Sequence, residues 1–435
     1  MSLSLLTKGP LYLKEVQVCK LHRDPTTGKC KFLPLGRWRG TLGQDDIPFP
    51  YMVLSDHLDM VGVELKATYT QTRKTNGDIL QTRIKNTIGP WQAGKFMPIS
   101  QRPWSINSYA LSKVWYKCNS VDLRVADITF ITSKVKSWLM ADQLEKPEEM
   151  VLYRPSSYGG LGLHHVKLKA QAMLIRSFLE TAANPKYIHN LYHTSLYRYY
   201  VLQHRDIQDP GLPPYYSLEF FNTIRSTYEN TSLKVETMSS SQWYTLLLQN
   251  NITMEDETPD SARQYRAARA ERAYPENDWE SAWRMARLRG LGSDLTSFMW
   301  KLLHGLLPTQ DRVSRILRDK TPLCKLCPDA VLENPQHALF SCSYNNFLSS
   351  YIPGISTNQI LHLNMDLEPS EEFPLVWMTG NFLYNIWKAR LDRKQVRPYS
   401  IRADLEARAS ILSETRFSDE AVLIREMIHH CFDVL

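Results

Sequence analysis

Three cysteines and one histidine, crowded into nineteen residues, are the side chains of this 435-residue chain best suited to chemistry. The pattern is C-x2-C-x9-H-x4-C, and its members are Cys324, Cys327, His337 and Cys342. Three thiolates and an imidazole make the closed, four-coordinate donor set of a structural Zn²⁺ ion, with no position left open for catalysis. The pattern therefore predicts structural zinc. Spacing alone leaves one alternative, a chance cluster of buried cysteines beside a surface histidine.

The residues around this pattern predict short helices that position the ligands. Pro328 stops the chain from continuing as a helix after the Cys-x-x-Cys pair, and Glu333–Phe340 is expected to start a helix that carries His337. Pro308 opens another helix upstream. Before it, apolar residues recur at three- and four-residue steps, as on one buried helix face: Leu295, Phe298, Met299, Leu302, Leu303 and Leu306. Core positions, rather than base-stacking platforms, are expected for Trp279, Trp283, Trp300, Trp377 and Trp387.

Taken in order, these features resemble the zinc-binding domain at the C-terminal end of non-LTR (LINE-type) retrotransposon reverse transcriptases. The resemblance rests on Trp300–Arg312 before the cluster, on Glu333 and the four ligands within it, and on Asn385–Arg390 after it. It covers roughly residues 280–391.

Segments upstream resemble the palm and thumb of the same polymerases. Leu35–Gly40 and Asp59–Leu65 are similar to the last palm segments, and the second of them to the primer-grip strand. Trp104–Tyr116 resembles the start of the thumb, and Tyr153–Leu163 resembles the Pro…Gly-Gly-Leu-Gly segment that follows it. In the latter, Gly159–Gly162 is expected to form a tight turn, because its glycines lack the spacing of a dinucleotide fingerprint.

The catalytic signature of that family is not evident in this sequence. A reverse transcriptase holds two metal ions with carboxylates, including an aromatic-x-Asp-Asp turn between apolar strands. The only Asp-Asp pair is Asp45–Asp46, and its neighbours, Gln44 and Pro48 among them, indicate a polar loop. We therefore assign no catalytic residue. The expectation is a C-terminal fragment that lacks the polymerase aspartates and the endonuclease and is inactive alone, unless another chain supplies the missing N-terminal polymerase half.

The overall pattern predicts a mainly α protein with a small β-containing N-terminal segment. Short apolar runs suggest strands before about residue 70, and Asn76–Gly77 is a turn signal. Helical periodicity follows, with one stripe at Val125, Ile128, Ile131, Val135 and Leu139. The stiff loop Asp209–Pro214 is the best boundary. Four segments are expected: a palm remnant (1–75), a thumb-like helical region (76–208), a linker and helical connector (209–277), and the zinc-binding domain with C-terminal helices (278–435).

The net charge of +7 conceals an uneven distribution. Residues 61–140 carry twelve lysines and arginines against four acidic residues, residues 261–320 carry twelve against seven, and residues 328–435 carry nine against fourteen. Basic segments that follow a phosphate backbone are typical of nucleic-acid binding, so RNA or DNA is the predicted partner. A solvated face is the alternative for any single cation. The expected contacts are Lys113, Lys117, Arg124, Lys134 and Lys136 in the thumb-like region, and Arg312, Arg315 and Arg318 before the cysteines.

Composition favours an intracellular protein, nuclear or cytoplasmic, with no membrane role. No apolar run reaches the length of a membrane span, and seven cysteines with three at ligand spacing argue against a secreted disulfide framework. Two functions stay open. The chain is either a zinc-binding, nucleic-acid-binding portion of a LINE-type reverse transcriptase, or a retroelement-derived zinc protein that acts as an interaction scaffold. Salt-dependent binding to RNA or DNA would separate the two.

Overall fold

The computed structural model of the chain falls into two compact units. Unit 1 comprises Met1–Trp91, Ile106–Ser137 and His164–Asn251, and unit 2 comprises Gln92–Ser105, Trp138–Leu163 and Ile252–Leu435. Each unit is thus assembled from separate stretches of sequence. The residues that the structure describes are 3–6, 17–20, 30–33, 43–46, 52–60, 62–91, 97–141, 143, 146–186, 190–204, 206–212, 216–230, 234–252, 269–343, 357–363, 367, 369–394 and 397–433.

Unit 1 begins with short strands, as the N-terminal sequence predicts. A four-stranded sheet has the order β1-β2-β3-β4, with antiparallel pairing except between β3 and β4, which are parallel. Its strands are β1 (Leu3–Leu6), β2 (Gln17–Lys20), β3 (Cys30–Leu33) and β4 (Met52–Leu54). Between β3 and β4, the Asp-Asp pair lies in a short 3-10 turn, Gln44–Asp46, in which Asp45 is exposed. The palm-like segment Leu35–Gly40 lies outside the described residues.

The primer-grip-like segment Asp59–Leu65 forms a separate antiparallel hairpin. Its strands are β5 (His57–Met60) and β6 (Val63–Lys66), and Leu58 is paired with Leu65 in the register. Gly62 follows β5 with a φ of +77°, a left-handed conformation that favours glycine.

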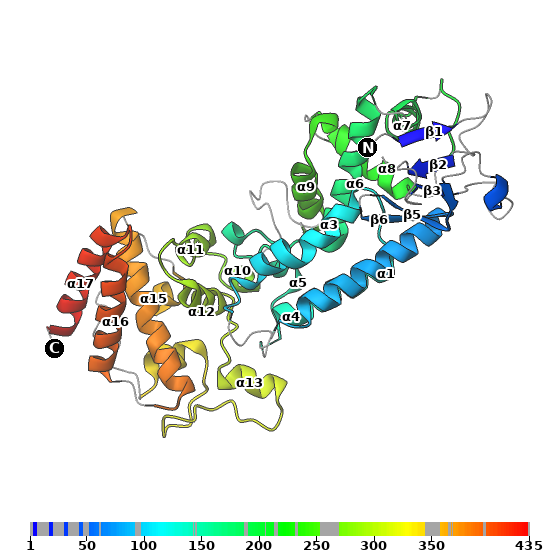
Figure 1. Cartoon of the computed structure of the whole chain (residues 1–435). Coiled ribbons are helices and arrows are strands. Elements are labelled where there is room, and N and C mark those ends of the chain that lie inside the picture. Colours follow the sequence, from blue (N-terminus) through cyan, green and yellow to red (C-terminus); the bar gives the residue numbers. More distant parts are fainter. Residues whose placement is uncertain are drawn as a thin grey trace. The chain divides into compact units, whose positions relative to one another are not determined.

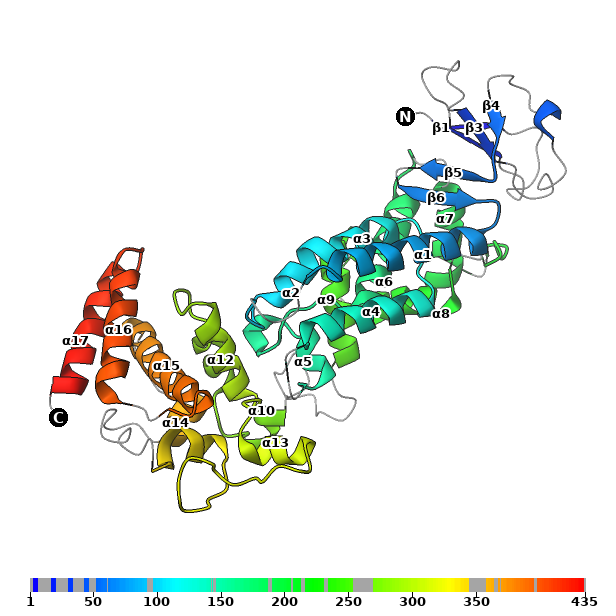
Figure 2. The same ribbon diagram turned by 60° about the horizontal axis from the view of Figure 1, so that its bottom comes forward.

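Helices make up the rest of unit 1 (Figure 2). The long helix α1 (Tyr69–Ile88) packs against β6 and α3, and α6 packs against α3, α7 and α8. The further helical elements are η4 (Ile106–Leu111), α3 (Ser112–Cys118), α4 (Val125–Leu139), α6 (Val166–Ala183), α7 (Asn190–Leu196), η6 (Tyr197–Val201), α8 (Leu218–Asn230), η7 (Val235–Thr237) and α9 (Ser240–Ile252).

Asn76 and Gly77 do not form the predicted turn, because they lie in the middle of α1. Asn76 Nδ2 donates a hydrogen bond to Glu64 O at 2.7 Å, and Asn76 Oδ1 accepts one from the Glu64 N–H at 3.1 Å. A Cβ atom at Gly77 would lie 2.2 Å from Asp127 Oδ2, so the glycine permits α4 to approach α1 closely. The pair is a packing site, and these tertiary contacts override its turn propensity.

The apolar stripe predicted for α4 is confirmed over most of its length. Ile131, Val135 and Leu139 are buried. Val125 is 78% exposed, contrary to the prediction, since it is the first residue of the helix and has no turn before it to cover its side chain.

Unit 2 is a helical domain built around α12 (Ser293–Leu303) and α15 (Pro369–Leu391) (Figure 1). Helices α16 (Pro398–Ser413) and α17 (Ser418–Asp433) pack against each other and against α15. The remaining elements are α2 (Arg102–Ser105), α5 (Glu149–Tyr153), η5 (Ser156–Tyr158), α10 (Arg269–Ala273), α11 (Trp279–Met285), α13 (Gln310–Ile316), η8 (His337–Ser341) and α14 (Thr357–His362). The predicted mainly helical fold with a small N-terminal β segment is therefore confirmed.

The core of unit 2 contains the residues that periodicity assigned to it. The α12 stripe is buried at Leu295, Phe298, Met299, Leu302 and Leu303, with Leu306 partly covered. All five tryptophans named above are also buried, between 1% and 7% exposed. In the described part of the chain, no helix is long and apolar enough to cross a membrane.

The Pro…Gly-Gly-Leu-Gly segment packs within unit 2 and makes the predicted tight turn. Gly159 has a φ of +76°, and its carbonyl oxygen accepts hydrogen bonds from Trp300 Nε1 and from the His304 ring, each at 2.8 Å. The His304 ring lies 4.6 Å from the ring centroids of both Trp283 and Trp300. Burial in this aromatic cluster lowers the pKa of His304 to about 3, because the charged imidazolium would lose its hydration.

Candidate zinc centre

The predicted ligands converge from three short pieces of backbone in unit 2. Cys324 follows a β-bridge between Leu323 and Leu332, and its N–H donates to Val331 O at 2.8 Å. Cys327 ends the Cys-x-x-Cys turn, and η8 is the predicted helical start that carries His337. Cys342 follows η8 directly, with its N–H donating to His337 O at 2.9 Å. Local backbone structure thus delivers all four donors to one place.

The geometry of the four donors fits a zinc ion. Cys324, Cys327, His337 and Cys342 are all buried, and their ligand atoms lie within 4.8 Å of one another. The sulfurs of Cys324 and Cys342 are 3.9 Å apart, and Cys327 Sγ is 3.5 Å from His337 Nε2. Tetrahedral zinc, with Zn–S near 2.3 Å and Zn–N near 2.0–2.1 Å, implies edges of about 3.8 Å and about 3.6 Å.

Burial of the imidazole among the thiols argues against the alternative, a chance cluster of buried cysteines beside a surface histidine. The sulfurs of Cys324 and Cys342 stand too far apart for a disulfide, whose S–S bond is about 2.05 Å. His337 is 6% exposed rather than a surface residue. The site is therefore a closed Cys₃His zinc centre, and zinc is its structural cofactor. Among the described residues, no other group of three or more histidine, cysteine or acidic side chains is arranged to hold a metal ion.

Hydrogen bonds to Cys324 Sγ favour its thiolate form, the form that binds a metal ion. The N–H groups of Leu326 and Cys327 donate to Cys324 Sγ at 3.4 and 3.5 Å. Burial by itself would raise the pKa of Cys324, but these bonds and one from Arg390 lower it to about 6. The pKa of Cys327 is raised by burial and by the neighbouring Cys324. The Asn334 side chain accepts from the His337 N–H at 2.7 Å and so caps the turn that carries the imidazole.

Arg390, on α15, reaches the centre from 48 residues beyond the last ligand. One guanidinium nitrogen donates to Cys324 Sγ at 3.1 Å and the other to Cys342 Sγ at 3.7 Å. The guanidinium also forms a buried ion pair with Glu333, and both side chains are about 5% exposed. Three thiolates around a bound Zn²⁺ would carry one net negative charge, and Arg390 would place a positive charge beside two of the sulfurs while Glu333 holds the arginine in place. With Glu333 included, the group keeps one net negative charge.

Glu333 connects the centre to α13 as well. Its side-chain Oε1 accepts from the Gln310 N–H at 3.1 Å, and its backbone carbonyl accepts from the Asp311 N–H at 3.2 Å. The carboxylate therefore satisfies one of the free N–H groups at the start of α13 and binds the arginine of α15 at the same time. The sequence indicates Glu333 and Arg390 only through the family resemblance, because their contact joins residues 57 positions apart.

The arginines expected to contact nucleic acid lie on and just after α13. Arg315 is exposed and its guanidinium binds both oxygens of Asp311, at 2.9 and 2.7 Å. Arg312 is partly buried on the same helix, and Arg318 is exposed beyond its end. Helix α13 precedes the segment Cys324–Cys342, which contains the four ligands and is called the zinc knuckle below. These side chains therefore adjoin the zinc centre along the chain.

The cations expected in the thumb-like region have different surroundings. Lys113 and Lys134 are exposed, Lys113 donating to Thr87 Oγ1 at 2.7 Å, and Lys136 is partly buried. Arg124 is held by the carboxylates of Asp78 and Asp127, each at 2.6 Å.

Lys117 departs from the expectation. It is 1% exposed, and its Nζ donates to Asn76 Oδ1 at 2.6 Å. Burial lowers the pKa of this lysine, and the nearby positive charge of Arg83 lowers it further. In this structure, therefore, its ammonium group is a packing partner of α1 and not a surface cation that could meet phosphate.

Comparison with known proteins agrees with the chemistry of the centre. Residues 261–348 match the family model described as zinc-binding in reverse transcriptase. No curated protein matches the chain. The family match includes α13 and all four ligands and ends before Arg390. The chain thus carries a zinc-binding domain of the reverse-transcriptase-associated type.

Proposed function

We propose that this chain is the zinc-binding, nucleic-acid-binding C-terminal part of a LINE-type reverse transcriptase, acting inside the cell in the nucleus or cytoplasm. The observation that carries the proposal is the buried Cys₃His centre within residues 261–348, the segment that matches the reverse-transcriptase zinc-binding family. A closed centre has no coordination position for a substrate, so its contribution is to hold a fold that presents neighbouring side chains.

Exposed cations beside the centre and in unit 1 support contact with phosphate. Arg315 and Arg318 adjoin the knuckle, and Lys113 and Lys134 lie on the surface of unit 1. The pair between Arg315 and Asp311 is a surface ion pair worth at most about 1 kcal/mol, so a phosphate can replace the carboxylate at little cost. Binding of this kind depends on charge and carries no base information.

The test is binding of single-stranded RNA and DNA between about 50 and 200 mM salt, where such contacts weaken strongly. Each neutralised phosphate contributes about −0.7 to the log–log salt slope, so four contacts would give about −3. Changing Arg315 and Arg318 to glutamine should make the slope shallower by about 1.4, and the pair Lys113 and Lys134 should behave alike.

The matched control neutralises two exposed lysines that belong to neither pair, Lys186 and Lys234. That variant should bind like the unaltered chain. Absence of binding at low salt would favour the alternative, a retroelement-derived zinc protein that acts as an interaction scaffold. If the chain binds and neither pair of substitutions weakens binding, the assignment of these cations to phosphate contacts is wrong.

A further inference from the structure

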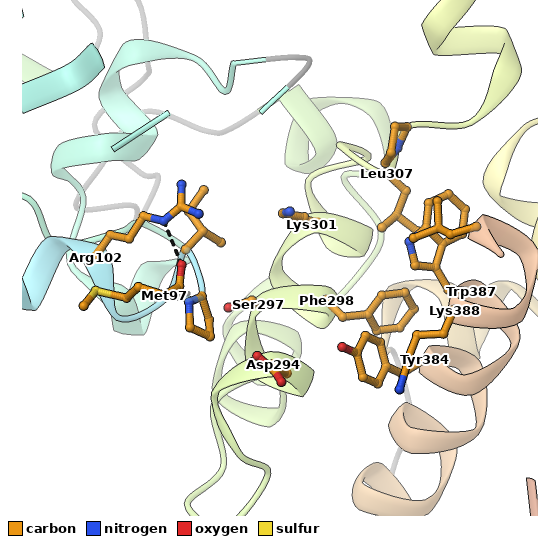
Figure 3. Close-up of a pocket in the computed structure, with 14 residues that line it drawn as sticks. Met97, Arg102, Asp294, Ser297, Phe298, Lys301, Leu307, Tyr384, Trp387 and Lys388 are labelled. Carbon is orange, nitrogen blue, oxygen red and sulfur yellow. Dashed lines mark hydrogen bonds between the residues drawn. The ribbon is translucent and has the colours of Figure 1, made fainter. Parts of the chain in front are cut away.

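A pocket of about 490 Å³ in unit 2 is lined by α12, by α15 and by residues 97–102 (Figure 3). It is separate from the zinc centre but shares α15 with it, since Trp387 and Lys388 line the pocket and Arg390 binds the thiolates. Pockets for ligands of nucleotide size span about 300–1,000 Å³, so one nucleotide fits and a duplex does not.

One wall of the pocket is aromatic. Tyr384 from α15 is partly exposed, and its ring centroid lies 5.4 Å from that of Phe298 on α12. Phe298 and Trp387 are 4% and 6% exposed, so they support the wall from the core while Tyr384 offers the accessible ring (Figure 3). At the rim, Pro308 is exposed and Leu391 is 58% exposed, which gives the wall an apolar lip open to solvent. Flat apolar and aromatic surfaces of this kind hold unstacked bases without strong sequence preference.

The charged groups of the pocket favour an anion. Two cations that solvent reaches, Lys301 and Lys388, line it against one acid, Asp294. Arg102 also lines the pocket, but it is 1% exposed and its guanidinium donates to Met97 O and Leu139 O. Lys388 is exposed and its Nζ lies 5.5 Å from the centroid of the Tyr384 ring, and no carboxylate in the described residues pairs with it. An ammonium group on the edge of an aromatic wall places a phosphate contact next to a base contact.

We propose that this pocket binds one nucleotide of a single-stranded nucleic acid, with Lys388 and Lys301 at the phosphates and the base against the Tyr384 wall. The inference rests on the proposed function and assigns it a specific site. Pro308, which lines the pocket, precedes α13, the helix that carries Arg315. An acidic peptide would satisfy the lysines but would leave the aromatic wall without a planar partner.

The experiment uses the full, zinc-loaded chain and a fluorescent eight-nucleotide single strand, as RNA and as DNA. Lys388→Glu should weaken binding about tenfold and make the salt slope shallower by about 0.7, the value of one phosphate contact. The control is Lys394→Glu, the same charge change at an exposed lysine just past α15 and outside the pocket, which should leave affinity within about twofold. Circular dichroism and zinc content verify that both variants fold.

A second readout locates the base directly. Photocrosslinking of a strand that contains 4-thiouridine should label the peptide with Tyr384 and Trp387. Salt-dependent binding with no effect of Lys388→Glu, and crosslinks elsewhere, would overturn the pocket assignment and leave the proposed function standing. No binding by the unaltered chain would overturn both. Displacement of the strand by polyglutamate at equal charge concentration would assign the pocket to acidic peptides instead.

Discussion

The zinc knuckle and the helical core of unit 2 are stabilised by different means. The buried cluster at the knuckle consists of Cys324, Cys327 and Cys342, with Leu326 packed against it. The helical core, by contrast, buries many large apolar side chains from α11 to α17, including Trp283, Met299 and Ile386. A stretch this short cannot bury enough apolar surface to hold itself, so a metal and a buried ion pair take the place of a core.

The two regions should therefore unfold under different conditions. Loss of metal or of the Arg390 charge acts on the knuckle, because its contacts are bonds to sulfur. The helical core depends on buried area, and two connections join it to the metal site. Ala338 and Leu339 of η8, the element that carries His337, are buried in this core. Arg390 is the second connection, since it lies on a core helix and donates to two ligand sulfurs.

The largest effect is expected from breaking the metal site. Cys327→Ala should abolish stoichiometric zinc and unfold the knuckle, since structural zinc contributes on the order of 10 kcal/mol in finger-type peptides. Hydrogen exchange should then show lost protection between residues 322 and 343 and retained protection in α16 and α17. The matched control is Cys431→Ala, which removes a half-buried cysteine of α17 that is not a ligand.

Two results would contradict this separation of knuckle and core. Full zinc content in Cys327→Ala would show that the assigned ligand is wrong. Simultaneous loss of protection in α16 and α17 would show that the two regions unfold as one cooperative unit.

An intermediate effect is expected at the connection between the regions. Arg390→Met leaves Glu333 buried without its partner and leaves the thiolates without their counter-charge. Removing one partner of a buried ion pair costs about 3–5 kcal/mol, which chemical unfolding at saturating zinc would measure. Zinc should also be lost more readily to a competing chelator, because a neighbour that binds the ligands directly tunes metal affinity.

A second variant tests whether the lost stability comes from the unpaired Glu333 carboxylate. Adding Glu333→Gln to Arg390→Met should recover part of the lost stability, since the amide removes the unpaired charge, but should not restore zinc retention. Lys394→Met, at an exposed lysine just past the same helix, should change neither quantity. Equal zinc retention in the chain with and without Arg390 would show that the contact is structural only.

The smallest effect concerns acid and the helical core. The pKa of His304 is about 3 in the fold, against 6.5 as the ordinary value. Below pH 6.5 the unfolded chain therefore takes up a proton that the folded chain refuses until about pH 3. The stability from this group is complete above pH 6.5 and declines as the pH falls, by about 2 kcal/mol at pH 5.

The variant His304→Gln stays neutral and can still donate to the Gly159 carbonyl. In unfolding experiments with chelator present throughout, so that zinc release plays no part, it should lose about 2 kcal/mol less than the unaltered chain between pH 7 and pH 5. Parallel pH curves for the two chains would show that the imidazole is not shielded as the structure indicates.

Features that depend on neighbours along the chain could be predicted from the amino-acid sequence. The four ligands lie within nineteen residues, so their spacing alone predicts one tetrahedral site. The α12 stripe and the buried tryptophans follow from helical period and side-chain size, and both predictions are confirmed. The helical period misleads at Val125, the first residue of α4, where the period continues but there is no preceding turn to cover the side chain.

Contacts between side chains far apart in the sequence became evident only from the packing of the helices. Arg390 donates a hydrogen bond to Cys324 Sγ, 66 residues away in sequence, and Lys117 donates one to Asn76 Oδ1, 41 residues away. Helical periodicity does not predict these contacts. The same packing placed Asn76 and Gly77 inside a helix despite their turn propensity, and it turned a lysine predicted for phosphate into a buried partner of α1. A local pattern predicts the chemistry that a residue can perform, whereas its burial and its partner are set by the elements that pack around it.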